Sequence, residues 1–203
     1  MMRALLLVLA ALAAPAVALA AGPTQSLGAD EVLRGRFVQE RQLSGFKSPL
    51  RSEGHFVLAP SRGLIWDADK PFAVTTIITP DGLAQNIDGS QALRLDAAKV
   101  PFLSRLYDML GGALSGDWRR MEADFTVTRT GNDKSWRVSM VPRTSDNVAM
   151  PFRSIEVTGG RFVDVIVMTR PDGDTDTLRL LDQSLARGDP TPGESAVFDS
   201  ARR

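Results

Sequence analysis

The sequence predicts a mainly β protein, folded as an antiparallel meander with one helical insert. Five dipeptides that favour tight turns separate its short apolar-rich runs: Asp81-Gly82, Asp88-Gly89, Gly131-Asn132, Gly159-Gly160 and Asp172-Gly173. Such dipeptides supply the positive φ that two-residue hairpins need. Tight turns join antiparallel neighbours, whereas parallel strands need long crossovers, so the runs are expected to pair in order along the chain.

The runs between these turns are short and rich in β-branched and aromatic residues, which is typical of strands. We expect eleven strands, at residues 36–43, 51–58, 63–68, 72–79, 83–87, 92–95, 124–129, 135–141, 153–158, 162–169 and 175–181.

The segment between Val100 and Phe125 has the spacing of a helix instead. Its apolar residues recur three and four positions apart and form one stripe: Phe102, Leu103, Leu106, Tyr107, Leu110 and Leu114. Pro101 suits the first helical turn, and Asp117 can cap a second short helix that carries Trp118. A helical insert is therefore expected between two β blocks.

Strand 162–169 is apolar on both faces. Strict alternation places Val163, Val165 and Val167 on one face and Phe162, Ile166 and Met168 on the other. Apolar residues on both faces need cover on both faces. The insert can cover one of them. A second sheet, closure of the same sheet or a bound apolar ligand can cover the other, and the pattern alone leaves these three open.

The N-terminus resembles a secretory signal. Arg3 precedes a short apolar core, and Ala18-Leu19-Ala20 is a small-x-small cleavage pattern. We expect a signal peptide at residues 1–20 and one domain at residues 21–203, located in the periplasm. An uncleaved membrane anchor is the alternative, although the strongly apolar part falls short of the about 20 residues of a spanning helix.

Composition excludes several classes of function. The formal net charge is zero, and there is no cysteine, so neither a nucleic-acid surface nor a thiolate metal site is expected. His55 is the lone histidine, and no Gly-x-Ser-x-Gly motif is present, which disfavours a hydrolase. Asp172, Asp174 and Asp176 alternate like calcium ligands but lack the closing Glu of an EF-hand, so we expect a solvated turn there. No catalytic residue, metal or cofactor is predicted.

A series of motifs follows a fixed order in the first half of the chain. A Phe37-Val38-Gln39 strand is followed by a strand ending in Gly54-His55-Phe56-Val57-Leu58. A Pro60-Ser61-Arg62-Gly63 turn then leads into a strand that ends in Trp66, and Pro71 and the Asp81-Gly82 turn follow. In this order the motifs resemble the LolA family of outer-membrane lipoprotein carriers, and Ser115-Gly116-Asp117-Trp118 resembles a divergent branch of that family.

The resemblance implies an incomplete antiparallel β-barrel of about 10–11 strands, with a helical lid over an apolar cavity. It implies a monomeric carrier without stable membrane insertion, which takes lipoproteins or another lipid from an inner-membrane transporter to an outer-membrane acceptor. The residues expected to line the cavity or lid are Phe37, Phe56, Leu58, Trp66, Phe102, Leu103, Leu106, Tyr107, Leu110, Trp118, Met140, Phe162 and Ile166.

Two departures from the family pattern concern the lid. The main branch has an arginine directly before the turn proline, where it holds the lid closed. That position is Pro60 here, and the nearest arginine is Arg62, which is the candidate replacement. The long N-terminal helix of the main branch is reduced to residues 30–34. We therefore expect a lid built from Leu43–Leu50 and the Val100–Met121 insert, and we expect the insert to plug the cavity of the empty protein. The alternative function is a sensor or adaptor module on the same fold, with a filled interior.

Overall fold

The computed structural model describes residues 27–100, 121–122, 124–143 and 152–201. Within these residues, eleven strands form one antiparallel sheet in the order β6-β5-β4-β3-β2-β1-β11-β10-β9-β8-β7. The strands are β1 (Glu31–Gln42), β2 (Leu50–Ala59), β3 (Gly63–Lys70), β4 (Val74–Thr79), β5 (Gly82–Ile87), β6 (Ser90–Asp96), β7 (Phe125–Asn132), β8 (Ser135–Pro142), β9 (Ser154–Gly159), β10 (Val163–Thr169) and β11 (Thr175–Arg187).

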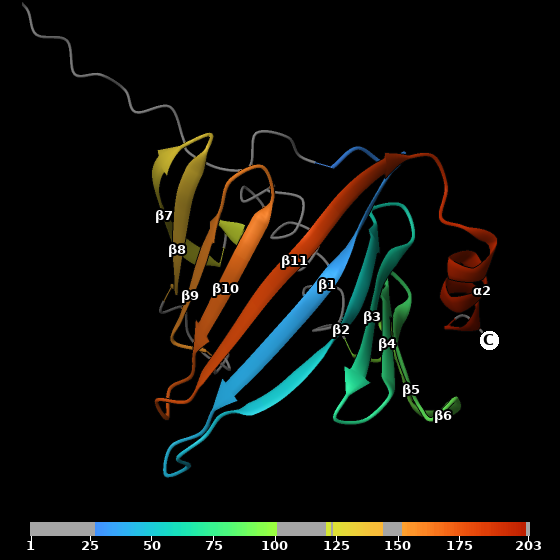
Figure 1. Ribbon diagram of the computed structural model, residues 1–203, viewed down its shortest axis with the longest axis horizontal. Coiled ribbons are helices and arrows are strands. Elements are labelled where there is room, and N and C mark those ends of the chain that lie inside the picture. The colour runs from blue at the N-terminus through green and yellow to red at the C-terminus, as the bar shows by residue number, and fades with distance from the viewer. Residues whose placement is uncertain (1–26, 101–120, 123, 144–151, 202–203) are drawn as a thin grey trace, which may run out of the picture.

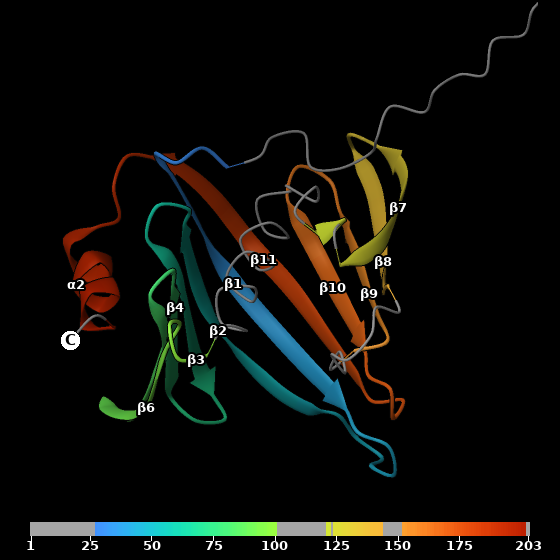
Figure 2. The same cartoon turned by 180° about the vertical axis from the view of Figure 1, so that it is seen from behind.

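The sheet is a meander whose first and last strands pair with each other. β1 pairs with β11 over Glu31 to Gln42, while β6 and β7, which are consecutive in sequence, are its two edges. Figures 1 and 2 show that the sheet is curved, with β1 and β11 in the middle and both edges bent toward the same side. The predicted insert thus connects two strands that lie at opposite edges of an open sheet.

The predicted strands and antiparallel order are confirmed, with three corrections. The remnant helix expected at residues 30–34 is wrong, because β1 begins at Glu31 and pairs with β11 from there. β11 continues to Arg187, six residues beyond the predicted end at Leu181. The β7–β8 turn follows Asn132, so Gly131-Asn132 ends β7 and is not the turn itself.

A β-bulge corrects the predicted faces of β10. The register with β9 shifts between Val163 and Val165, so Asp164 is the extra residue. A bulge breaks strict alternation, and Val163 consequently packs in the same cluster as Ile166, with Phe162 and Met168 against it. The apolar residues of β10 are therefore less evenly divided between its two faces than the sequence indicates.

One helix, α2 (Pro192–Ser200), is present among the described residues and was not expected from the sequence. Thr191 caps it: its hydroxyl accepts from the Glu194 backbone N–H, and the Glu194 carboxylate accepts from the Thr191 N–H. This reciprocal pair is a capping box, and the Thr-x-x-Glu spacing was the signal available in the sequence. α2 packs beside β3 and β4 (Figure 1).

Part of the expected architecture lies outside the described residues. These are the signal peptide and residues 101–120, which hold most of the predicted insert and lid. The described part is an open sheet rather than a sheet closed by helices. No helix in that part is long and apolar enough to cross a membrane.

Candidate functional site

The main feature of the sheet is a continuous apolar face, which we call the inner face. Sixteen buried residues form one cluster on it, contributed by β1–β4, β7–β11 and Met121. Its members are Leu33, Phe37, Phe56, Leu58, Leu64, Ile78, Met121, Phe125, Trp136, Val138, Met140, Ile155, Val157, Val163, Ile166 and Leu180. Apart from β10 with its bulge, these strands place inward apolar residues at alternate positions, and register aligns the apolar positions into one surface.

Stacked aromatic rings form the centre of this face. The rings of Phe37 and Trp66 stack with centroids 3.8 Å apart, and Phe56 lies 6.1 Å from Trp66. Gly35 makes room for this arrangement, because a Cβ there would meet the Phe56 ring at 2.6 Å. Gly35 and Phe56 are paired across β1 and β2, so the missing side chain on one strand accommodates the ring on the other.

The inner face also carries apolar side chains that are only partly buried. Eight strand, loop and N-terminal residues of this kind pack against the cluster: Leu27, Trp66, Leu83, Val127, Phe152, Phe162, Met168 and Leu178, with Ala68 and Leu185 beside them. An apolar surface that keeps some exposure can gain contacts with an apolar ligand, whereas a closed core cannot. The inner face therefore combines a packed base with a partly accessible apolar surface.

The structure brings together every predicted cavity residue that it describes. Phe37, Phe56, Leu58, Met140 and Ile166 are buried members of the cluster, and Trp66 and Phe162 are partly buried against it. The other six lie outside the described residues: Phe102, Leu103, Leu106, Tyr107, Leu110 and Trp118. Sequence reasoning missed the parts of the face contributed by Leu33, Leu180 and Trp136. Alternation along their strands was available to find Leu180 and Trp136, whereas Leu33 lies in the segment that was expected to be helical.

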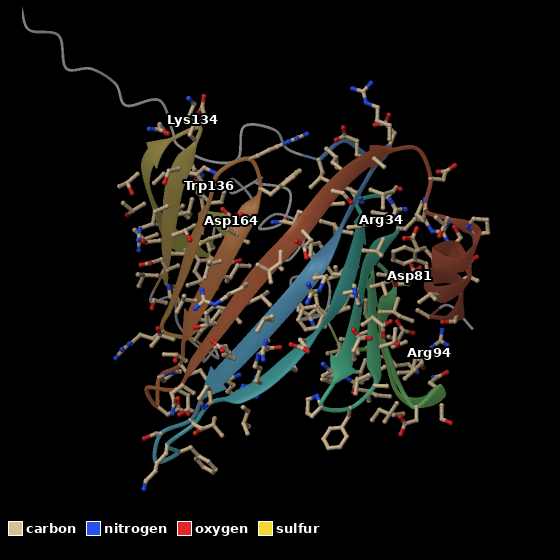
Figure 3. The ribbon with its side chains drawn as sticks, viewed as in Figure 1. Arg34, Asp81, Arg94, Lys134, Trp136 and Asp164 are labelled. Carbon is tan, nitrogen blue, oxygen red and sulfur yellow. The ribbon has the colours of Figure 1, made fainter. Side chains whose placement is uncertain are left out.

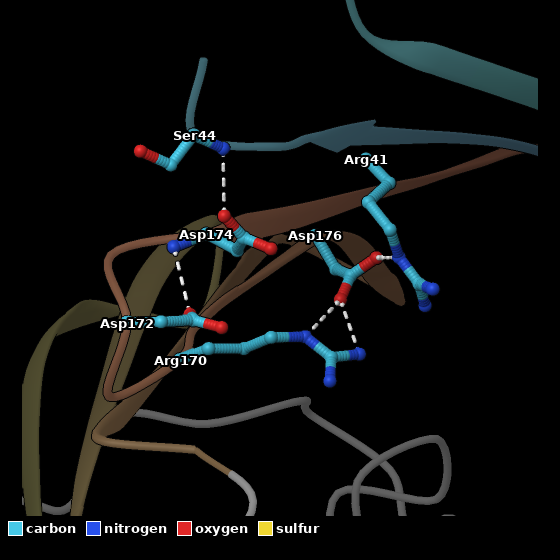
Figure 4. A network of polar contacts seen from close by, with 6 residues as sticks. All are labelled: Arg41, Ser44, Arg170, Asp172, Asp174 and Asp176. Atoms are coloured by element: carbon cyan, nitrogen blue, oxygen red, sulfur yellow. Dashed lines mark hydrogen bonds and ion pairs between the residues drawn. The ribbon is translucent and has the colours of Figure 1, made fainter. Parts of the chain in front are cut away.

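The inner face ends in a buried charged cluster at the start of β11. Asp176 precedes Leu178 and Leu180 on the same side of β11, and its side chain is only 2 % exposed. Arg41 Nε donates to Asp176 Oδ1 at 2.6 Å, and Arg170 donates to Oδ2 from Nε and Nη2 at 3.2 and 3.0 Å (Figure 4).

Asp176 is thus buried in a strand, whereas a solvated turn running into a strand was expected over Asp172, Asp174 and Asp176. Burial acts to raise the pKa of its carboxyl, but the hydrogen bonds from Arg41 and Arg170 outweigh burial and hold the pKa below its usual value. The neighbouring residues do form a turn, in which Asp172 accepts from the Asp174 N–H. Asp174 in turn accepts from the Ser44 N–H at 2.7 Å, which ties the β10–β11 turn to the β1–β2 loop.

On the opposite, outer face, a second cluster of buried apolar residues lies beneath α2. Its five members are Val32, Ala59, Ile65, Ile77 and Phe198. Phe198 is the buried residue of α2. The helix therefore covers a short apolar strip of β1–β4 on the side away from the inner face.

Three arginines hold α2 on the outer face. Arg34 binds both carboxylate oxygens of Glu194 at 2.7 Å, Arg62 binds Asp199 at 2.6 Å, and Arg94 donates to the Ala201 carbonyl at 2.7 Å. The pKa of Glu194 falls to about 2, chiefly because Arg34 donates to the ionised carboxylate. The described contacts of Arg62 lie with α2, and its role as the lid arginine stays a prediction.

Groups with catalytic or metal-binding potential are dispersed among the described residues. His55 lies in the middle of β2, and its Nδ1 is 3.0 Å from Asp69 at the exposed end of β3. The described part contains no group of three or more potential metal ligands.

Two surface hollows lie at separate places on the sheet and are polar or mixed in lining. One of about 550 Å³ includes Asp81 and Arg94, and the other, of about 480 Å³, includes Lys134 and Asp164 (Figure 3). Partial burial raises the pKa of Asp164. Both hollows are open, and neither is lined chiefly by residues of the apolar cluster.

An open antiparallel sheet with one large apolar face defines a class of mainly β proteins suited to binding apolar ligands. Within that class, the family model described as "Outer membrane lipoprotein carrier protein LolA-like" matches residues 13–192. The chain belongs to this family. A comparison with curated proteins found no match.

The solved structures that match this chain are distant from it in sequence. A LolA superfamily protein from Nitrosomonas europaea is 7% identical, with a TM-score of 0.42, and the match covers 81% of this chain and 89% of that chain. A putative outer membrane lipoprotein-sorting protein domain from Vibrio parahaemolyticus is 9% identical, with a TM-score of 0.41 and coverage of 84% and 92%. The Pseudomonas aeruginosa MucB in its complex with MucA is 14% identical, with a TM-score of 0.37 and coverage of 81% and 56%.

Proposed function

We propose that this protein is a periplasmic carrier that binds the acyl chains of lipoproteins, or of another lipid amphiphile, on the inner face. It shuttles them from an inner-membrane donor to an outer-membrane acceptor, as a monomer, after a signal peptide at residues 1–20 is removed. The observation that carries the proposal is the continuous apolar inner face, with partly buried side chains such as Trp66, Met168 and Leu178 along it. Membership of a carrier family supports the same role.

The energetics of such a site favour strong binding. Burying one methylene contributes about 0.8 kcal/mol, so an acyl chain laid along this face gains several kcal/mol before ordering costs are subtracted. A carrier must also release its cargo. We propose that part of the chain covers the inner face when cargo is absent, so that cargo replaces protein contacts that already exist. The predicted insert around Leu106 is the candidate for that cover.

Native mass spectrometry of the protein purified from its own cells tests the carrier role. We expect a mass increment that matches a lipid or an acylated peptide and disappears after extraction with organic solvent. A protein that carries no lipid, and that takes up none when mixed with acylated peptides, contradicts the proposal. That result would favour the sensor or adaptor module instead.

A matched pair of variants tests whether the inner face is the binding surface. Leu178 and Thr177 are neighbours on β11, both partly buried, with Leu178 packed against the inner-face cluster and Thr177 on the other side of the strand. Leu178→Lys places a charge among acyl chains, and we expect a fluorescent fatty-acid probe to bind at least about ten-fold more weakly.

Thr177→Lys adds the same charge one residue away on the outer face, opposite Glu40 of β1. We expect this control to bind the probe like the unsubstituted protein. Circular dichroism and urea denaturation establish that both variants are folded. Equal probe binding by the two variants would exclude the inner face as the site.

A further inference from the structure

The β1–β2 and β3–β4 loops present the most exposed large apolar side chains of the described residues. Phe72 is 73%, Phe46 60% and Leu50 55% exposed. Large apolar side chains gathered at one place on a surface mark an interaction site more often than isolated ones do. From these loops we propose that the β1–β2 and β3–β4 loop tips form a contact surface for phospholipid bilayers that contain anionic lipid.

The two loops lie at the same end of the sheet. β1 to β4 are consecutive antiparallel neighbours, so the loop after β1 and the loop after β3 must emerge at one end. Lys70 at the end of β3 is paired with Glu53, so β2 continues three residues past the end of β3 to Leu50, and the β1–β2 loop lies farther out than the β3–β4 loop. Figure 1 shows the β1–β2 loop extending past the rest of the sheet at this end.

The β1–β2 loop is held in a fixed conformation although Phe46 is exposed. Its turn is closed by a hydrogen bond from the Phe46 N–H to the Leu43 carbonyl at 3.1 Å. The Gln42 side chain donates to the Phe46 carbonyl at 2.7 Å, and Asp174 accepts from the Ser44 N–H. The backbone that carries the Phe46 ring is therefore anchored on both sides, and the ring is presented to solvent rather than folded back onto the sheet.

Charge distinguishes these two loops from the other hairpins at the same end. Residues 43–51 and 70–73 contain Lys47, Arg51 and Lys70 and no acidic residue. Arg51 and Lys70 both pair with Glu53, and Lys47 makes no ion pair with the described residues. In contrast, the β5–β6 turn holds Asp88 beside the less exposed Ile87, and the β10–β11 turn holds Asp172 and Asp174.

This combination matches the interface of an anionic bilayer. Aromatic and aliphatic side chains enter the boundary between head groups and acyl chains, while lysines remain at the level of the phosphates. Each basic side chain near an anionic surface contributes about 1 kcal/mol, so a small patch gives reversible rather than permanent attachment. The inference goes beyond the proposed carrier function, since it concerns how the protein meets a membrane and not what it carries.

Sedimentation with vesicles tests the inference on the full mature chain. Vesicles of phosphatidylethanolamine and phosphatidylglycerol are compared with vesicles of phosphatidylcholine alone, at low and high salt. We expect binding to the anionic vesicles that weakens with salt. The double variant Phe46→Ser with Phe72→Ser is expected to lose at least about ten-fold in affinity, and Lys47→Glu about five-fold.

The matched control is Leu93→Ser with Leu181→Ser, which removes two exposed apolar side chains located elsewhere, at 41% and 39% exposure. We expect it to bind vesicles like the unsubstituted protein. Equal loss in the control, no loss in the Phe46 and Phe72 variant, or no vesicle binding at all would overturn the inference, and the last result would leave a protein partner as the occupant of these loops.

The fatty-acid probe separates this inference from the carrier proposal. The Phe46 and Phe72 variant should bind the probe normally, because neither residue belongs to the inner-face cluster. Leu178→Lys should bind vesicles normally. Failure of vesicle binding with intact probe binding contradicts the membrane contact alone. Failure of probe binding with intact vesicle binding contradicts the inner face as the carrier site.

Discussion

The two faces of the sheet are stabilised in different ways. The inner face joins nine strands through one cluster of sixteen buried apolar residues, whereas the buried cluster of the outer face has five residues beneath α2. On the outer face, Arg34, Arg62 and Arg94 supply much of the attachment of the helix. The inner face is therefore expected to govern the cooperative stability of the whole sheet, and the outer cluster to govern the docking of α2.

The largest expected difference in the free energy of unfolding is between two truncations, Phe37→Ala in the inner cluster and Phe198→Ala in the outer one. Phe37 is fully buried and stacked on Trp66, so Phe37→Ala should reduce the free energy of unfolding by about 3–5 kcal/mol. Phe198→Ala should instead release α2, with a smaller loss for the sheet. Urea denaturation measures the global effect, and amide hydrogen exchange of residues 195–200 measures the helix.

Three observations contribute to that expectation: the burial of both rings, their separate clusters and the short length of α2. If Phe198→Ala lowered the stability of the sheet as much as Phe37→Ala, the two faces would form one cooperative unit. The proposed division between them would then be wrong.

The next effect concerns the charged end of the inner face. Asp176→Ala leaves Arg41 and Arg170 without their shared carboxylate, and we expect a loss of about 2–4 kcal/mol in the free energy of unfolding. Both arginines are more than one third exposed, so water relieves part of the repulsion between them. Asp176→Asn keeps the shape and should lose less.

Amide exchange at Ser44 provides a local measure of the same cluster. Asp176 is the second residue of β11, which directly follows Asp174, and Asp174 accepts from the Ser44 N–H. Loosening of the β10–β11 turn should therefore speed exchange at Ser44. Unchanged stability and unchanged exchange in Asp176→Ala would show that the cluster does not fix the end of the sheet.

The smallest effect is expected on the outer face, at Glu194. Glu194→Gln retains a side chain that can complete the capping box but removes the charge that Arg34 binds. We expect α2 to be destabilised by about 1 kcal/mol at neutral pH, as measured by hydrogen exchange within the helix.

The pH dependence of this effect has a defined sign. The pKa of Glu194 is about 2 in the folded protein, against an ordinary value of 4.5. The carboxylate therefore contributes its full stability above about pH 4.5 and loses it as the pH falls toward 2. The difference in α2 stability between the unsubstituted protein and Glu194→Gln should shrink over that range. A constant difference would show that Glu194 does not stabilise α2 through its charge.

The strands could be predicted from the sequence because their signals are local. Turn dipeptides such as Asp88-Gly89 dictate the conformation at their own positions, and both residues adopt positive φ in the structure. Alternation within each strand likewise placed Phe37, Phe56 and Trp66 together on one face. The capping box of α2 was equally local, so that helix was predictable in principle.

Other features depend on tertiary contacts and could not be predicted from local patterns. Residues 31–34 form a strand because β11 extends far enough to pair with them. The bulge at Asp164 changes which face Val163 occupies, and the sequence of β10 alone does not indicate a bulge. The burial of Asp176 requires Arg41 from β1, which lies 135 positions away in the chain.

The central claim is that acyl chains lie on the inner face, and methyl NMR with a spin-labelled fatty acid tests it most directly. We predict that the label broadens the methyl signals of Leu178, Met168 and Ile166, which belong to or pack against the inner cluster, and spares those of Val32, Ile65 and Ile77, which belong to the outer one. Broadening confined to the outer cluster, or equal broadening of both clusters, would contradict the account.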